Sequence, residues 1–188
     1  MGGFLRDDLP MGLRWGLWRT GVGRTFLAIL VLWALASGCS HPELRGGVFS
    51  KPPNVRYRIG ELPQPWHRVS LHDNDIAWTL PDDGHSIAVN STCQSYEDAP
   101  LPVLTRHLLV GFTDPQLLEQ QTAMLDGREA LNSRCRAKLD GVPIELLMVV
   151  MKKNGCVYDF MYVSPAGRFD EKSGDFERMI QQFKSEEP

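Results

Sequence analysis

Two short dipeptides, Asp140-Gly141 and Asn154-Gly155, constrain the fold of this chain more than any other feature of its sequence. Asp-Gly and Asn-Gly are preferred in two-residue β-hairpin turns, because both central positions of such a turn require a positive φ. Each dipeptide separates two apolar runs of strand length, and a similar dipeptide, Asp126-Gly127, precedes the first run. The pattern predicts a three-stranded antiparallel meander over residues 128–139, 142–153 and 156–164.

Two-residue turns also fix the register of the meander, placing Lys153 opposite Cys156. Because side chains alternate along a strand, the register sorts the meander residues onto two faces. One face is almost entirely apolar, and the other is largely apolar but carries Asn132 and, toward one end, Arg134, Arg136 and Glu145. Both faces therefore need a cover. We predict an α+β fold, in which an antiparallel sheet containing this C-terminal meander is covered by helices on both sides, like an α/β/α sandwich.

Shorter elements flank the meander. Apolar residues at helical spacing predict a helix over residues 101–112. The chain ends on a clearer helix, for which Ser173 or Asp175 is the expected cap. Its apolar residues recur at i, i+3, i+4 and i+7, namely Phe176, Met179, Ile180 and Phe183. Strand candidates ahead of both helices cover residues 56–59, 66–70, 75–80 and 85–93.

This order of strands, a helix, a long meander and a terminal helix resembles the PsbP-like α/β/α superfamily. The resemblance covers roughly residues 55–183, including the ending that runs from Tyr158-Asp159-Phe160 to Phe183. It implies a binding or assembly role, because that superfamily consists largely of non-enzymatic accessory proteins. It assigns no functional residue to this chain.

The N-terminal leader carries basic residues followed by an uninterrupted apolar run over residues 26–36. This run is too short to cross a bilayer, which takes roughly 20 residues, but it suits the apolar region of a signal peptide. It leads into Ala36-Ser37-Gly38-Cys39, which resembles the lipobox of bacterial lipoproteins. The resemblance implies cleavage of a signal peptide over residues 1–38 and attachment of diacylglycerol and palmitate-like chains at Cys39. Met11 is an alternative start, and an uncleaved membrane anchor is the alternative reading of the leader.

The region after the leader divides into a tether and one domain. Residues 39–54 are rich in Gly and Pro, which predicts a flexible, lipidated tether. Residues 55–188 have the length of a single α+β domain. Ser40 stands where lipoproteins retained in the inner membrane carry Asp, so the lipoprotein resemblance implies an outer-membrane anchor facing the periplasm.

The charge balance bears on the partners. The chain has 20 basic and 23 acidic residues, and the leader removes more basic than acidic ones. The remaining domain is mildly acidic without a basic patch, which argues against nucleic acid. We expect the membrane, through the lipid anchor, and a protein of the cell envelope as partners.

Three cysteines other than Cys39 remain for an oxidising compartment. In the predicted register Cys135 lies too far along the sheet from Cys156 to bond with it, and on the opposite face. We therefore favour a disulfide between Cys93 and Cys156 and expect Cys135 to be a buried thiol. A redox pair is the alternative, but no Cys-x-x-Cys spacing supports it.

The sequence offers little catalytic or metal-binding chemistry. The histidines have no metal-ligand spacing, and we expect them at the surface or in turns. Asp73-Asn74-Asp75 lacks the Gly and Glu of a calcium loop, which favours a solvated turn. No nucleophile elbow, phosphate loop or dinucleotide fingerprint is present. We therefore expect no catalytic residue, no metal and no cofactor.

Asp159 is the one charged residue on the apolar face of the meander. A buried carboxylate must be paired, hydrogen-bonded or protonated, so Asp159 is a candidate for a raised pKa. The alternatives are an ion pair at the end of the sheet and an inward charge that protects an edge strand.

These observations favour a non-enzymatic binding or assembly module tethered in the cell envelope. The alternative is a carrier that holds a small apolar ligand or lipid against an aromatic face formed by Tyr158, Phe160 and Tyr162. A third class, a hydrolase of envelope polymers, requires two carboxylates facing a cleft.

Overall fold

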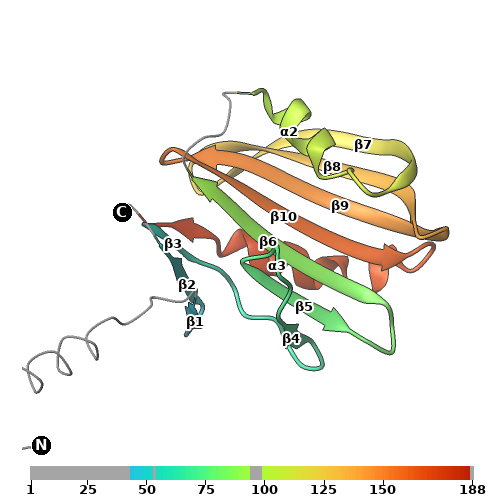
Figure 1. Cartoon of the computed structure of the whole chain (residues 1–188), viewed down its shortest axis with the longest axis horizontal. Helices are drawn as coiled ribbons and strands as arrows, with labels where there is room; N and C mark the ends of the chain where they lie inside the picture. The colour runs from blue at the N-terminus through green and yellow to red at the C-terminus, as the bar shows by residue number, and fades with distance from the viewer. Residues whose placement is uncertain (1–42, 53, 94–98, 187–188) are drawn as a thin grey trace, which may run out of the picture. The chain divides into compact units, whose positions relative to one another are not determined.

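The computed structural model describes residues 43–52, 54–93 and 99–186 (Figure 1). The chain divides into two units, residues 1–39 and 40–188. The predicted leader and Cys39 therefore lie outside the described residues, and the following description concerns the second unit alone.

Most of this unit is one seven-stranded antiparallel sheet with the order β4-β5-β6-β10-β9-β8-β7. Its strands in chain order are β4 (His67–Val69), β5 (Ile76–Leu80), β6 (His85–Cys93), β7 (Thr113–Leu125), β8 (Arg128–Leu139), β9 (Val142–Lys153) and β10 (Cys156–Pro165). A four-stranded sheet has the order β1-β2-β3-β11. Its strands are β1 (Glu43–Arg45), β2 (Val48–Lys51), β3 (Val55–Arg58) and β11 (Lys184–Ser185). The helices are α2 (Leu101–His107), the short 3-10 helix η1 (Phe169–Glu171) and α3 (Ser173–Gln181).

The predicted meander and its register are confirmed. Cys156 pairs with Lys153 across the β9–β10 turn, and Leu139 pairs with Val142 across the β8–β9 turn. Asp140 and Gly141 have φ values of 50° and 83°, as a two-residue hairpin turn requires. The turn residues thus determined both the strand boundaries and the pairing.

The meander has a fourth strand, β7, which the sequence did not predict. Asp126 and Gly127 have φ values of 48° and 73° and join β7 to β8 in a third tight turn. Every residue of β7 except Leu125 is exposed. A strand exposed on both faces lacks the alternation of apolar and polar residues from which strands are recognised.

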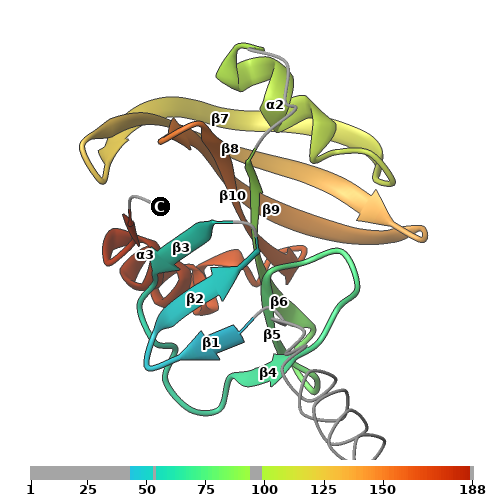
Figure 2. The same cartoon turned by 60° about the vertical axis from the view of Figure 1, so that its left-hand side comes forward.

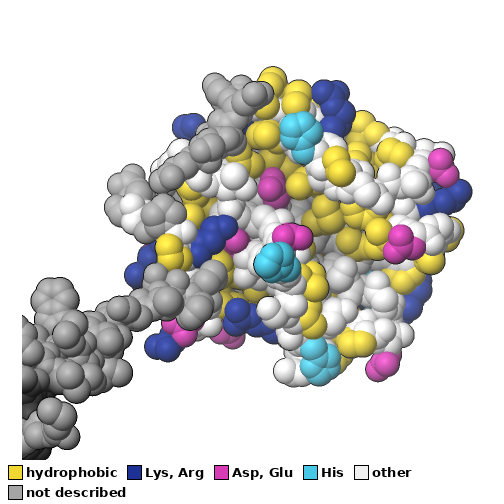
Figure 3. Space-filling model, in the orientation of Figure 1, with side chains coloured by type: hydrophobic (Ala, Val, Ile, Leu, Met, Phe, Trp, Pro, Cys, Tyr) yellow, Lys and Arg dark blue, Asp and Glu magenta, His cyan; other side chains and the backbone are white. Residues whose placement is uncertain are grey.

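Helices cover both faces of the large sheet, as predicted (Figure 2). On the α3 face, named for the helix that covers it, the sheet packs against α3, η1 and the four-stranded sheet. On the opposite α2 face, a smaller cluster containing Cys135, Leu146 and Met148 packs against residues at the end of α2. The hydrophobic side chains left at the margin of α2 are visible in Figure 3.

The flexible tether predicted over residues 39–54 is wrong for its described part, which begins at Glu43. Strands β1 and β2 form a hairpin, and Gly46 and Gly47 make its turn with φ values of 54° and 73°. Phe49 of β2 has no exposed surface, and its ring centroid lies 5.0 Å from that of Tyr57. The glycines that suggested a linker serve as a hairpin turn.

Both predicted helices form, with different ends. Helix α2 ends at His107, and residues 108–111 continue as turns rather than as helix. Lys172 occupies the N-cap position of α3, without a side-chain cap hydrogen bond. The cap therefore lies one residue before Ser173 and three before Asp175, and Asp175 accepts a hydrogen bond of 3.0 Å from Nε1 of Trp66 in the first turn of the helix.

Candidate functional site

A groove of about 490 Å³ opens on the α3 face, between α3 and η1 on one side and strands β7–β9 on the other. Its floor is apolar and comes mainly from Ala130 of β8 with Leu147 and Val149 of β9. Ile180 of α3 and Phe169 of η1 supply the apolar part of the opposite wall. The other lining residues are polar or small, or lie along the edge of the sheet, namely Glu119, Gln121, Ala123, Met124, Leu125, Asn132, Arg134, Asp170, Ser173, Glu177 and Gln181.

The groove exists because the cover of the α3 face is narrower than the sheet. Among the strands of the large sheet, α3 packs most closely on β10. The outer strands β8 and β7 continue past the helix and present small side chains there, Ala130 and Ala123. A short helix over a wide sheet therefore leaves an open channel along its outer side.

Arg134 at the groove forms an ion pair with a neighbouring carboxylate. Its Nη2 lies 2.8 Å from Oε2 of Glu145, whose side chain is only 5% exposed. Burial alone would raise the pKa of Glu145, but hydrogen bonds from Arg134 and the backbone N–H of Gly167 outweigh it and hold the pKa below its ordinary value. The guanidinium also lies 3.8 Å from the ring centroid of Phe169, a cation–π contact. Arg134 is thus fixed in place as part of the groove wall.

The rim of the groove is acidic. Glu119 of β7, Asp170 of η1 and Glu177 of α3 are all exposed. Within the described parts of the chain, none of the three forms an ion pair. All three carboxylates share an exposed environment. The groove therefore offers a ligand an apolar floor and a negatively charged rim.

The aromatic face proposed for an apolar ligand is filled by the protein itself. Tyr158, Phe160 and Tyr162 are at most 2% exposed. The ring of Phe183 lies 4.9 Å from that of Tyr158 and 5.0 Å from that of Phe160, measured between centroids. Tyr162 contacts the rings of Phe169 and Phe176. These residues belong to the core because the segment from η1 to β11 covers them, and the open groove lies on the same face but over the outer strands.

The structure brings Cys93 and Cys156 together in a disulfide, with their Cα atoms 4.1 Å apart on the paired strands β6 and β10. Cys135 carries a free thiol that is buried on the α2 face. Burial raises the pKa of this thiol above its ordinary value. Cys135 is therefore poorly suited to act as a nucleophile.

Asp159 lies on the α2 face of β10, opposite Asn90 and Val150 of the neighbouring strands. Burial, followed by the nearby negative charge of Asp75, raises the pKa of Asp159 to about 6. No ion pair of Asp159 occurs within the described residues. Asp75 itself is tied into the core, where it pairs with Lys51 and accepts a hydrogen bond from Tyr57. Of the alternatives left open for Asp159, the raised pKa agrees with its burial, whereas no ion pair is found among the described residues.

Histidines do not gather into a site. No group of three or more metal-ligating side chains occurs in the portions that the structure describes, and the histidines visible in Figure 3 lie apart from one another. His85 contradicts the expected position at the surface or in a turn, because it begins strand β6 and has no exposed surface. Its Nδ1 lies 2.9 Å from the Tyr162 hydroxyl, which donates to the carbonyl of Phe169 at 3.0 Å. The hydroxyl therefore accepts from Nδ1–H, and in the neutral ring Nε2 is unprotonated. Nε2 has no hydrogen bond in the described structure and lies 3.8 Å from the Glu171 carboxylate.

Sequence reasoning missed the groove. Two signals pointed toward it, namely the charged residues at one end of the α3 face and the Asp126-Gly127 turn. The turn implied a strand before β8, but the exposed sequence of that strand concealed it. Without β7 the groove has no outer wall.

The sheet, its two covers and the terminal helix define an α+β protein with the PsbP-like fold. One similar solved structure is the cyanobacterial PsbP protein CyanoP from Synechocystis sp. PCC 6803, at a TM-score of 0.51 and 13% identity over 78% of this chain and 91% of that one. Another is LpqN of Mycobacterium tuberculosis, described as involved in cell envelope biogenesis, at a TM-score of 0.50 and 14% identity over 77% of this chain and 89% of that one. Identities this low establish a common fold and nothing more.

No protein-family model matches the chain, and no curated protein matches it either. Among the described residues, no helix has the length and hydrophobicity needed to cross a membrane.

Proposed function

We propose that this chain is a lipid-anchored, non-enzymatic binding module of the bacterial cell envelope, and that it binds an envelope protein in the groove beside α3. The observation that carries the binding role is the groove itself. Its volume of about 490 Å³ and its apolar floor with a polar rim match the general form of binding pockets.

Two further observations support the envelope location. The Cys93–Cys156 disulfide suits an oxidising compartment such as the periplasm. LpqN, which shares the fold, is described as involved in cell envelope biogenesis. Together with the lipobox-like sequence ending at Cys39, they favour an outer-membrane anchor with the domain facing the periplasm.

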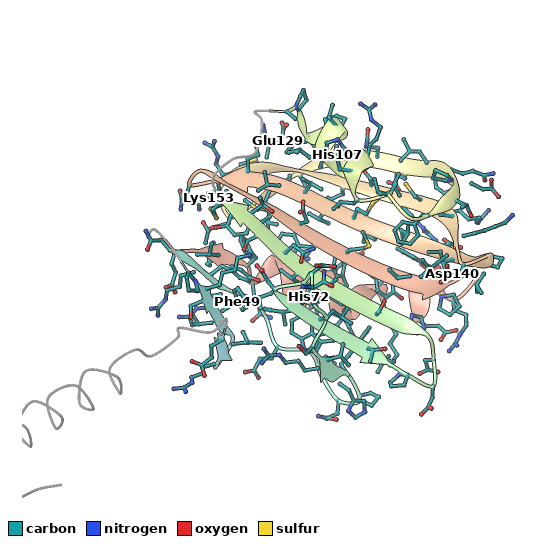
Figure 4. All side chains as sticks on the ribbon, in the orientation of Figure 1. Phe49, His72, His107, Glu129, Asp140 and Lys153 are labelled. Atoms are coloured by element: carbon teal, nitrogen blue, oxygen red, sulfur yellow. A yellow bond between two sulfur atoms is a disulfide. The ribbon has the colours of Figure 1, made fainter. Side chains whose placement is uncertain are left out.

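The groove is tested by site-specific crosslinking in living cells. A photoreactive amino acid at Gln181, which lines the groove and is exposed, should give one discrete adduct with an envelope protein. The same probe at Asp140, in the β8–β9 turn at the far end of the meander, should give none (Figure 4).

A matched pair of variants shows whether the adduct depends on the groove. Ala123→Trp places a large ring in the groove, whereas Thr122→Trp places it on the same exposed strand but away from the groove lining. We expect Ala123→Trp to abolish the Gln181 adduct and Thr122→Trp to preserve it. Equal effects of the two variants would exclude the groove as the binding site.

The anchor is tested by the intact mass of protein extracted from membranes. A mass that begins at Cys39 and carries diacylglycerol with an added acyl chain is expected. An unmodified chain that retains residues 1–38 would refute the anchor and, with it, the proposed compartment.

A further inference from the structure

Strand β7 forms the outer edge of the large sheet and pairs on one side only. Within the described residues, β8 is its sole strand partner (Figure 2). Alternate residues of an edge strand direct their backbone N–H and C=O groups away from the sheet, where another strand can pair with them. At 13 residues, β7 offers a long row of such groups.

Proteins usually protect exposed edges with proline, lysine or bulges. In β7 these devices occupy the first half alone, where Pro115 and two register shifts interrupt the pairing. Residues 119–125 pair continuously with β8 and contain neither proline nor lysine. This second half of β7 is therefore a regular and unprotected edge.

The same stretch forms the outer wall of the groove. Glu119, Gln121 and Ala123 line it, and they alternate along the strand as residues on one face must. A strand added beside residues 119–125 would direct every second side chain to the α3 face, over the mouth of the groove.

The electrostatics of the groove favour a basic occupant. Glu119 stands on the edge strand, and Glu177 and Asp170 stand on the opposite wall, all exposed and without an ion pair in the described chain. The cation among the lining residues, Arg134, is already paired with Glu145. Lys or Arg side chains over the mouth of the groove would meet three uncompensated carboxylates.

We propose that residues 119–125 of β7 accept an extended, basic segment of a partner protein as an additional strand, whose backbone pairs with the free edge and whose alternate Lys or Arg side chains lie over the groove. This inference rests on the proposed function, since it names the partner chemistry of that groove. The backbone pairing supplies affinity, and the alternate basic side chains supply selectivity.

The test uses the full-length protein in detergent micelles and a fluorescent nine-residue peptide of alternating Lys and Val. Fluorescence anisotropy measures its affinity, against a peptide in which Glu replaces Lys. We expect the Lys peptide to bind at least tenfold more tightly, and its affinity to fall as salt is raised. Equal binding of the two peptides would overturn the proposal that the partner segment is basic.

Backbone methylation separates strand addition from loose electrostatic binding. In a β-pair alternate amides face the partner strand. One Lys peptide is methylated on the amides of its Lys residues, and a second on those of its Val residues. One of these sets should lose binding at least tenfold while the other retains it; equal binding of both would overturn strand addition and leave the groove in place.

The double variant Glu119→Gln/Glu177→Gln should lower the affinity for the Lys peptide several-fold and reduce the dependence of that affinity on salt. Glu129→Gln, at an exposed acid of β8 outside the groove lining, is the matched control and should have no effect (Figure 4). If Glu129→Gln lowered the affinity as much as the double variant, the peptide would not bind at the groove and the proposed binding site would be overturned.

Measuring the oligomeric state tests the competing occupant, which is a second copy of this chain. Sedimentation analysis that shows a dimer broken by the Lys peptide would mean that a second copy of β7 occupies the edge, which would overturn the partner proposed here. Absence of peptide binding would likewise overturn this inference, whereas the Gln181 crosslink decides the proposed function independently.

Discussion

Ionisation of the partly buried Asp159 carboxylate should lower the stability of the folded protein. Its pKa of about 6 in the folded protein lies above its ordinary value of 3.8. The folded state therefore holds the proton more tightly than the unfolded state, and stability is gained as the pH falls from above 6 toward 4. At neutral pH the ionised group costs at most about 3 kcal/mol, at 1.36 kcal/mol per pKa unit.

Asp159→Asn should consequently raise the free energy of unfolding by about 1–3 kcal/mol at pH 7.5 and change it little at pH 4. Urea denaturation at the two pH values measures the difference. Asp82→Asn, which alters an exposed acid, is the control. Destabilisation by Asp159→Asn at pH 7.5 would mean that the carboxylate has a stabilising partner.

His85 should have the opposite pH dependence. Burial, followed by the positive charge of Arg168, lowers its pKa below 6.5, although Glu171 and Asp83 partly oppose this and Lys172 adds to it. Because the unfolded chain takes up the proton first, stability is lost as the pH falls below 6.5. In the Asp159→Asn background, we expect stability to fall between pH 7 and pH 5 and His85→Gln to reduce that fall, as measured by urea denaturation. An unchanged slope would show that His85 takes up a proton without loss of stability.

At the scale of elements, the β7–β8 turn ties the meander to the end of the chain. The carboxylate of Asp126 lies 2.7 Å from Nζ of Lys153, and it accepts a hydrogen bond of 2.9 Å from the backbone N–H of Ser185 in β11. Burial alone would raise the pKa of Asp126, but these hydrogen bonds and one from Lys184 outweigh it and lower the pKa. The stability that this carboxylate supplies is present above its unfolded pKa and is lost as the pH falls through its folded pKa.

Asp126→Asn should therefore lower the free energy of unfolding by about 2–3 kcal/mol at pH 7. Asp140→Asn is a closely matched control, because Asp140 has a similar φ of 50° in the equivalent turn but is exposed. Asn tolerates a positive φ, so the control should change stability by less than about 0.5 kcal/mol. Equal losses in the two variants would assign the effect to the turn rather than to the ion pairs.

The elements that sequence predicted well are those whose determinants are local. Asp140-Gly141 and Asn154-Gly155 specify turn, register and facing residues within a few positions of the chain. Strand β7 and the β1–β2 hairpin also form around local turns, but their residues hide them. The residues of β7 are exposed on both faces and show no alternation, and the glycines of the β1–β2 turn resemble those of a linker. The groove was unpredictable because it arises from the width of the sheet relative to α3.

At the scale of the whole molecule, the Cys93–Cys156 disulfide joins strands that are 63 residues apart in sequence. Closing so long a loop restricts the unfolded chain, with an effect of about 4 kcal/mol in the chain-entropy description. The double variant Cys93→Ala/Cys156→Ala should lose stability on that order, as measured by urea denaturation against the oxidised wild-type protein. A loss below about 1 kcal/mol would indicate that the unfolded chain is already compact around this pair.

The position of Cys135 between the bonded cysteines has a consequence for biosynthesis. Of the three cysteines that follow Cys39, a chain made from its N-terminus presents Cys93 first, then Cys135, and Cys156 last. The wrong thiol is thus available to Cys93 before the right one. In the finished sheet Cys135 pairs with Leu117 and Leu146 on the neighbouring strands of the local meander and is buried on the α2 face. Early closure of the β7–β9 hairpins would withdraw this thiol from Cys93, so the two tight turns that join these strands would favour the correct oxidation of the chain as well as its shape.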